Sequence, residues 1–180
     1  MKGGIKAWDG LTAAGPADMG MSVLNGDVSA KEIIGIAYGM EAGLGELYRR
    51  MSGMTDDPEA AEIFTRLAGF EDKHKERLIA LYRSLDPDVE ATALAQMAQD
   101  NAMIEGGFTP DAFLERNRDE MRTVPGILNM AMMLEAQAMD LYHRYSQKID
   151  AEDARQILYD IAEEEKDHLK RLGQLMEDRS

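Results

Sequence analysis

The chain of 180 residues contains no cysteine, which excludes disulfide bonds, cysteine-ligated iron–sulfur clusters and catalysis by a thiol. It also lacks a run of about 18 apolar residues, the length that a membrane-spanning helix requires. No signal-peptide core lies near its first residue. We therefore expect a cytoplasmic protein, a location that the lack of disulfides permits.

Basic residues are scarce relative to acidic ones: 20 lysines and arginines stand against 34 aspartates and glutamates, a formal net charge of −14 at pH 7. Such a surface repels phosphates, so neither nucleic acids nor anionic membranes are expected as partners. Apolar and polar residues do not alternate for more than a few positions, so no strand is expected. The length suits one domain with a sizeable core.

The sequence contains the motif Glu-x-x-His twice, in matching surroundings. Each copy is preceded by a further glutamate at the same interval (71 − 41 = 30 and 165 − 135 = 30), and corresponding residues of the two copies are 94 positions apart. The six residues are Glu41, Glu71 and His74 in the first half and Glu135, Glu165 and His168 in the second.

The same 94-residue offset aligns residues outside the motif. Without a gap, Tyr48 falls on Tyr142 and Leu78 falls on Leu172. Chance repetition of a short motif would not bring matching apolar positions with it. We infer an internal duplication of a helical hairpin, with about 50 residues in each copy.

The first hairpin has clear helix boundaries. Ser29, followed three residues later by Glu32, is typical of a capping box at a helix start. Apolar residues then recur at steps of three and four until a turn, where Asp57 and Pro58 supply a cap and a first helical residue. The second helix is expected to end near Asp86.

A long connection follows, in which we expect one helix over Val89–Ile104 and a short one beginning at Thr109 and Pro110. Pro125 opens the third long helix, and a break near Asp150 precedes the last one. Two short-loop hairpins joined by a long crossover predict an all-α four-helix bundle over residues 29–180. Residues 1–28, rich in small residues and without a period, are expected to form an irregular extension.

The repeated residues suit a site for two metal ions. Residues three apart on a helix share one face, so the glutamate and histidine of each motif can approach the same ion. Four carboxylates balance the charge of two divalent ions, and mixed oxygen and nitrogen ligands suit iron or manganese, with zinc also acceptable. Glu41 and Glu135, each alone on its helix, are expected to fill the remaining positions and can bridge the two ions.

Two tyrosines and an acidic run lie near this site in the sequence. Tyr48 and Tyr142 each follow the single glutamate of their half by seven residues, on the same helix face. They either hydrogen-bond to the ligands and take part in oxygen chemistry or are ordinary core tyrosines. In the acidic run of residues 163–165, only Glu165 is expected to point inward.

Together with Leu67–His74 and Ile161–His168, these residues resemble rubrerythrin-type members of the ferritin-like superfamily, over roughly residues 29–177. The resemblance implies a ferritin-like bundle, usually dimeric, with a non-haem di-iron centre that reduces hydrogen peroxide or dioxygen. Carried over by position, it implies that the metal ligands are Glu41, Glu71, His74, Glu135, Glu165 and His168.

The chain departs from the family pattern in two ways. Full-length rubrerythrins carry a rubredoxin domain with a four-cysteine iron site, so here a separate electron-donor protein is expected. Typical members have another glutamate three residues after the third-helix ligand, which is associated with peroxidase activity; this position is Ala138. Residues 2–11 resemble the end of a rhodanese domain, which suggests a sulfurtransferase as a partner.

Two alternative functions remain open from the sequence. The same site could oxidise iron for storage or sequestration, in which case a closed multi-subunit shell is expected instead of a homodimer. It could also stabilise a helical scaffold that serves a sulfurtransferase.

Overall fold

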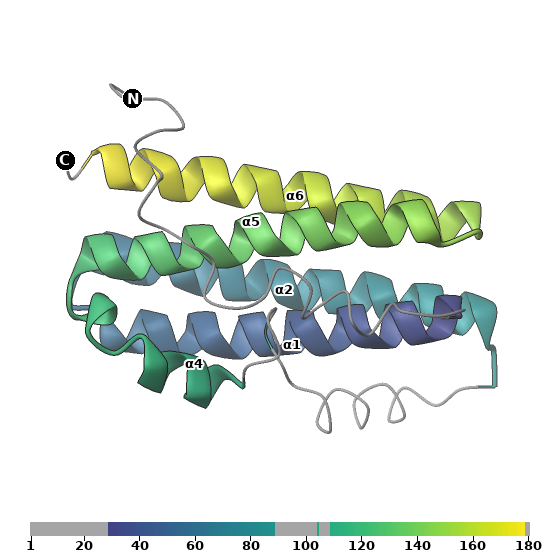
Figure 1. The fold of residues 1–180 in the computed structure, drawn as a ribbon, viewed down its shortest axis with the longest axis horizontal. Helices are drawn as coiled ribbons and strands as arrows, with labels where there is room; N and C mark the ends of the chain where they lie inside the picture. Colours follow the sequence, from purple (N-terminus) through teal and green to yellow (C-terminus); the bar gives the residue numbers. More distant parts are fainter. Residues whose placement is uncertain (1–28, 89–103, 105–108, 179–180) are drawn as a thin grey trace.

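The computed structural model describes residues 29–88, 104 and 109–178, and no β-strand occurs among them. Four long helices form the body of the molecule, and two short helical segments lie in the connection between the second and third (Figure 1). The elements are α1 (Ala30–Met54), α2 (Pro58–Leu85), α4 (Pro110–Arg116), the 3-10 helix η3 (Glu120–Arg122), α5 (Val124–Lys148) and α6 (Glu152–Glu177).

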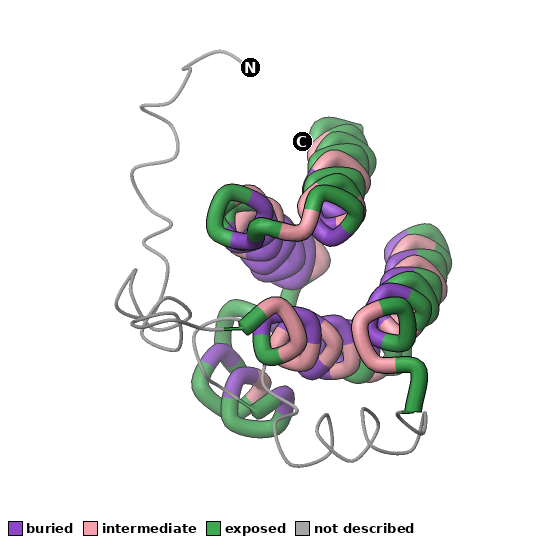
Figure 2. Tube along the Cα trace, turned by 90° about the vertical axis from the view of Figure 1, so that its right-hand side faces the viewer, coloured by how far each residue is buried: buried purple, intermediate pink, exposed green. Residues whose placement is uncertain are grey.

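The long helices form two antiparallel hairpins, α1 with α2 and α5 with α6, and the two hairpins face each other (Figure 2). Between the hairpins, α2 contacts α6 and α1 contacts α5. Helix α2 ends at one end of the bundle and α5 begins at the other, so the connection crosses the bundle's length (Figure 1). The predicted all-α bundle of two hairpins joined by one crossover is confirmed.

The predicted caps of the first hairpin are present. The side chain of Ser29 accepts a hydrogen bond from the backbone N–H of Glu32, and the Glu32 carboxylate accepts one from the backbone N–H of Ser29. The Asp57 carboxylate accepts two backbone N–H bonds in the first turn of α2, which begins at Pro58. These contacts satisfy donors that a helix start leaves open.

The start of α5 depends on a glycine. Thr123 caps this helix by accepting from the backbone N–H of Gly126, so the helix begins one residue before Pro125. A Cβ atom at Gly126 would lie 1.7 Å from the carbonyl oxygen of Glu120 in η3. The segment η3, which the sequence did not predict, therefore packs directly on the backbone of the first turn of α5.

Two predictions fall outside the described residues: the irregular extension of residues 1–28 and most of the helix expected over Val89–Ile104. Of the latter, only Ile104 is described, and its side chain is buried. The short helix expected after Thr109 is confirmed as α4, which packs against α1. No helix in the described part of the chain is both long and apolar enough to cross a membrane.

Apolar side chains from all four long helices pack into one core. Within this core lie six carboxylate and imidazole residues that are at most 2% exposed. They are the repeated residues Glu41, Glu71, His74, Glu135, Glu165 and His168.

Candidate metal centre

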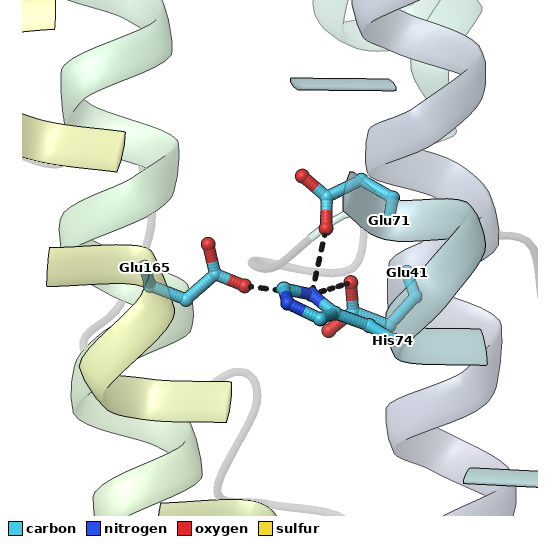
Figure 3. A group of neighbouring side chains, drawn as sticks. All are labelled: Glu41, Glu71, His74 and Glu165. Carbon is cyan, nitrogen blue, oxygen red and sulfur yellow. Dashed lines mark hydrogen bonds and ion pairs between the residues drawn. The ribbon is translucent and has the colours of Figure 1, made fainter. Parts of the chain in front are cut away.

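The bundle brings the six repeated residues together from all four long helices. Each single glutamate lies on the first helix of its hairpin, and each Glu-x-x-His motif lies on the second. Figure 3 shows one part of this cluster, in which residues of the first hairpin face Glu165 of the second. Burial of so many ionisable groups is rare unless they are paired or bind a metal.

The ligand atoms form two overlapping groups, and within each group all of them lie within 4.8 Å of one another. Each group has one histidine and one glutamate that the other group lacks, whereas Glu71 and Glu165 belong to both groups. The first group is Glu41, Glu71, His74 and Glu165, and the second is Glu71, Glu135, Glu165 and His168.

The residues common to both groups are Glu71 and Glu165, whereas the sequence suggested that Glu41 and Glu135 can bridge the two ions. The packing of the hairpins explains the difference. Helices α2 and α6, which carry the Glu-x-x-His motifs, contact each other more extensively than α1 and α5 do. The glutamates of these two helices consequently lie close to the ligand atoms of both groups.

Both histidines present the same nitrogen to the cluster. Nδ1 of His74 lies 3.2 Å from a carboxylate oxygen of Glu41 and 3.0 Å from one of Glu71. In the other half, Nδ1 of His168 lies 3.1 Å from Glu135 and 2.8 Å from Glu165. The two halves of the duplicated sequence therefore place their histidines in the same geometry relative to the glutamates.

The site has acceptor capacity that the protein leaves unused. Among the described residues, no hydrogen bond reaches Oε1 of Glu71 or Oε1 of Glu165, although both atoms are buried. The latter lies 3.4 Å from Nδ1 of His74, without hydrogen-bond geometry. Unsatisfied buried carboxylate oxygens are costly. The donor set of four carboxylates and two imidazoles therefore fits a pair of divalent cations.

In the absence of cations, protons compensate the charge. Burial, followed by the neighbouring charge of Glu165, raises the pKa of Glu135 to about 8. Burial also raises the pKa of Glu71 well above its usual range. Although burial opposes protonation of His168, its hydrogen bonds to Glu135 and Glu165 raise its pKa to about 10. The buried cluster therefore takes up protons when it holds no cations.

The two tyrosines hydrogen-bond across the bundle. Tyr48 of α1 donates to Oε1 of Glu135 at 2.5 Å, and Tyr142 of α5 donates to Oε1 of Glu41. Both tyrosines are fully buried, and burial raises the pKa of each phenol well above its ordinary value, so both remain neutral donors. Each tyrosine therefore contacts the single glutamate of the opposite hairpin, and a part in catalysis remains a prediction.

One residue at the site was missed by the sequence analysis, which expected it to face water. Oε2 of Glu164 lies 3.1 Å from Nε2 of His74, and Arg77 donates to Oε1 of the same carboxylate at 2.5 Å. The duplication gives no signal for this residue, because the position 94 residues earlier is Phe70.

A buried carboxylate–histidine cluster inside a four-helix bundle with one crossover defines the ferritin-like class. The family model for rubrerythrin matches residues 32–108 and 126–180, and the chain belongs to the rubrerythrin family. The resemblance of residues 2–11 to rhodanese lies outside this match and outside the described residues, and it stays a prediction.

Among solved structures, the chain is similar to a hypothetical protein, Pfu-1136390-001, from Pyrococcus furiosus. The two share 23% sequence identity with a TM-score of 0.61, over 84% of this chain and 90% of that chain. This likeness supports the fold. No curated protein matches the chain.

Proposed function

We propose that this protein is a non-haem di-iron oxidoreductase that reduces hydrogen peroxide or dioxygen. The observation that carries the proposal is the pair of overlapping ligand groups that share Glu71 and Glu165. Two cations held by these residues would be able to act on one small ligand together. Membership of the rubrerythrin family supports the same conclusion.

Iron is the cation that we propose for both positions. Each group offers three carboxylates and one imidazole, a set that suits iron or manganese and that zinc can also occupy. When bound, two ferrous ions would supply the two electrons that convert one hydrogen peroxide and two protons into two water molecules. The chain has no cysteine for an iron centre of rubredoxin type, so we place the donor that restores these electrons outside these residues.

The protein's own groups hold, neutralise and shield the centre. Four carboxylates match the charge of two divalent ions, and burial of the cluster keeps bulk water away. Tyr48 and Tyr142 fix the single glutamates through their phenol groups, so these carboxylates keep their orientation. Ala138, which is fully buried, adds no further carboxylate on α5.

Stopped-flow mixing tests the proposal directly. The protein loaded anaerobically with ferrous iron is mixed with hydrogen peroxide and, separately, with dioxygen, and iron oxidation is followed by absorbance. We expect oxidation of two irons per chain and a clear preference for one oxidant. Iron that stays ferrous with both oxidants would contradict the proposal and favour a metal-stabilised scaffold.

Two variants sharpen this test. Because Glu71 belongs to both ligand groups, Glu71→Ala should weaken iron binding at both positions and abolish the fast oxidation. Glu163→Gln changes an exposed carboxylate that pairs with Lys166 on the same helix, and it should leave the oxidation unchanged.

We further propose a homodimer as the assembly in solution. Mass measurement by light scattering separates this proposal from iron storage, because storage requires a closed shell of many subunits. A dimer that turns over peroxide or dioxygen would agree with the redox function. A large hollow assembly that accumulates iron would instead identify the protein as an iron-storage protein.

A further inference from the structure

The two halves of the metal centre differ at one pair of corresponding positions. Residues 70 and 164 are 94 positions apart, each directly before the glutamate of a Glu-x-x-His motif. Each contacts the histidine of the opposite hairpin: Glu164 contacts His74, and Phe70 contacts His168. The geometric relation is repeated, but the chemistry is different.

On the first side, the histidine has a charged acceptor behind it. Nε2 of His74 lies 3.1 Å from the Glu164 carboxylate, while Nδ1 faces the cluster. Arg77 of α2 holds the other oxygen of Glu164, so this carboxylate spans from α6 to α2. The Glu164 side chain is 34% exposed and lines a cavity of about 390 Å³, so it can be changed without opening the core.

On the second side, an aromatic ring replaces the carboxylate. The rings of Phe70 and His168 have their centroids 4.8 Å apart and are tilted by 40°. Nε2 of His168 has no hydrogen bond among the described residues. The Lys73 ammonium lies 5.0 Å from the centroid of the Phe70 ring. Arg171 corresponds to Arg77 in the repeat, but position 70 offers it no carboxylate.

This difference affects metal binding through the imidazole ring. A carboxylate that accepts from Nε2–H fixes the tautomer in which Nδ1 carries the lone pair for a metal, and it makes that nitrogen a stronger donor. It also locks the orientation of the ring. A phenyl ring restricts the orientation of His168 by packing but selects no tautomer and adds no electron density.

We propose that the two metal positions are inequivalent, with the position at His74 binding a divalent cation more tightly than the position at His168, because Glu164 acts as a positioning residue for His74. This inference rests on the proposed metal centre. Loss of one such supporting carboxylate typically lowers metal affinity about 10- to 100-fold, so the two positions should differ by about this factor.

Titration of the metal-free protein with Co²⁺ alone tests the inference, because visible absorption reports each ion as it becomes ligated and no turnover is needed. We expect two classes of site, one ion each, with dissociation constants about 10- to 100-fold apart. Two ions bound with equal affinity would overturn the inference and leave the metal centre intact. A protein that binds no Co²⁺ would overturn the proposed centre as well.

The duplication supplies matched variants. Glu164→Phe makes the first side like the second, so the titration should then show a single class of weak Co²⁺ sites. Phe70→Glu offers His168 an acceptor and Arg171 a partner, and it should tighten the weak class, a gain that a merely structural role for position 70 would not produce. Unchanged affinities in both variants would overturn the inference.

Two further variants guard against an effect on folding. Glu164→Gln keeps the shape of the side chain but removes its charge, and it should weaken the tight class less than Glu164→Phe does. Glu163→Gln, one residue earlier and paired with Lys166, should leave both classes unchanged. Equal weakening by Glu163→Gln and Glu164→Gln would show a general charge effect and overturn the assignment to Glu164.

Discussion

At the scale of single residues, the tyrosines connect the candidate metal centre to the stability of the bundle. Tyr48 and Tyr142 each donate to a buried glutamate of the opposite hairpin. Loss of either phenol hydroxyl would leave a buried carboxyl oxygen without its donor, and such an unsatisfied group is costly. These two bonds therefore hold the hairpins together as well as orienting ligands, which explains why both halves of the duplicated sequence have a tyrosine at this position.

The phenol groups can be removed one at a time. Tyr48→Phe and Tyr142→Phe should each lower the free energy of unfolding by about 1.5–3 kcal/mol, because a buried carboxylate oxygen loses its donor. Urea denaturation of the metal-free proteins measures this loss. Tyr159→Phe is the control, since Tyr159 is 45% exposed and should change stability little. Equal stability of all four proteins would contradict the interpretation.

Metal binding should release protons. At pH 7 His168, with a pKa raised to about 10, and Glu135, with a pKa raised to about 8, both hold protons that a metal must displace. The affinity for a divalent ion should therefore rise with pH between about 6 and 8. Calorimetric titration in buffers of different ionisation enthalpy counts the protons released, and we expect more than one for two ions bound. An affinity independent of pH would contradict this.

At the scale of elements, the helix starts are set by local chemistry, but one of them also needs space. Thr123 caps α5, yet the first turn of this helix lies against the backbone of η3. Only a glycine at position 126 permits this approach. At Gly69 in α2, by contrast, an added Cβ would meet nothing within 4 Å.

These two glycines predict opposite effects of the same substitution. Gly126→Ala should lower the free energy of unfolding by about 1–3 kcal/mol, because the new Cβ forces η3 and α5 apart. Gly69→Ala should raise it by about 0.5–1 kcal/mol, because alanine loses less backbone freedom in a helix. Thermal and urea unfolding of both variants provide the comparison. A destabilising Gly69→Ala would mean that α2 is packed more tightly there than the structure indicates.

At the scale of the whole molecule, the candidate metal centre lies where all four long helices meet, so its occupancy should control the stability of the entire bundle. Without cations, four carboxylates are buried together, and protons must take the place of the missing positive charge. The formal net charge of −14 adds general repulsion between helices.

Removal of metal should consequently lower the melting temperature. Each site filled at a hundredfold excess over its Kd adds about 2.7 kcal/mol to the free energy of unfolding. Thermal unfolding with and without a chelator measures the difference, which should disappear in Glu71→Ala. Identical melting of the metal-loaded and metal-free protein would indicate that the cluster binds no ion in the folded state.

Local patterns in the sequence determined the four long helices, the caps at Ser29 and Asp57, and the six buried residues at the centre. They could do so because capping is a contact between near neighbours and because the 94-residue repeat marks positions that the two hairpins use alike. The contact of Glu164 with His74, at a position where the other half has Phe70, was not predicted from the repeat.

Only the tertiary structure decided which carboxylates are shared, which histidine has a charged acceptor and why position 126 must be glycine. Each of these depends on how closely two helices approach, and that distance results from the packing of the whole core. A sequence pattern specifies which face of a helix turns inward, but the contact made by that face depends on the opposite helix.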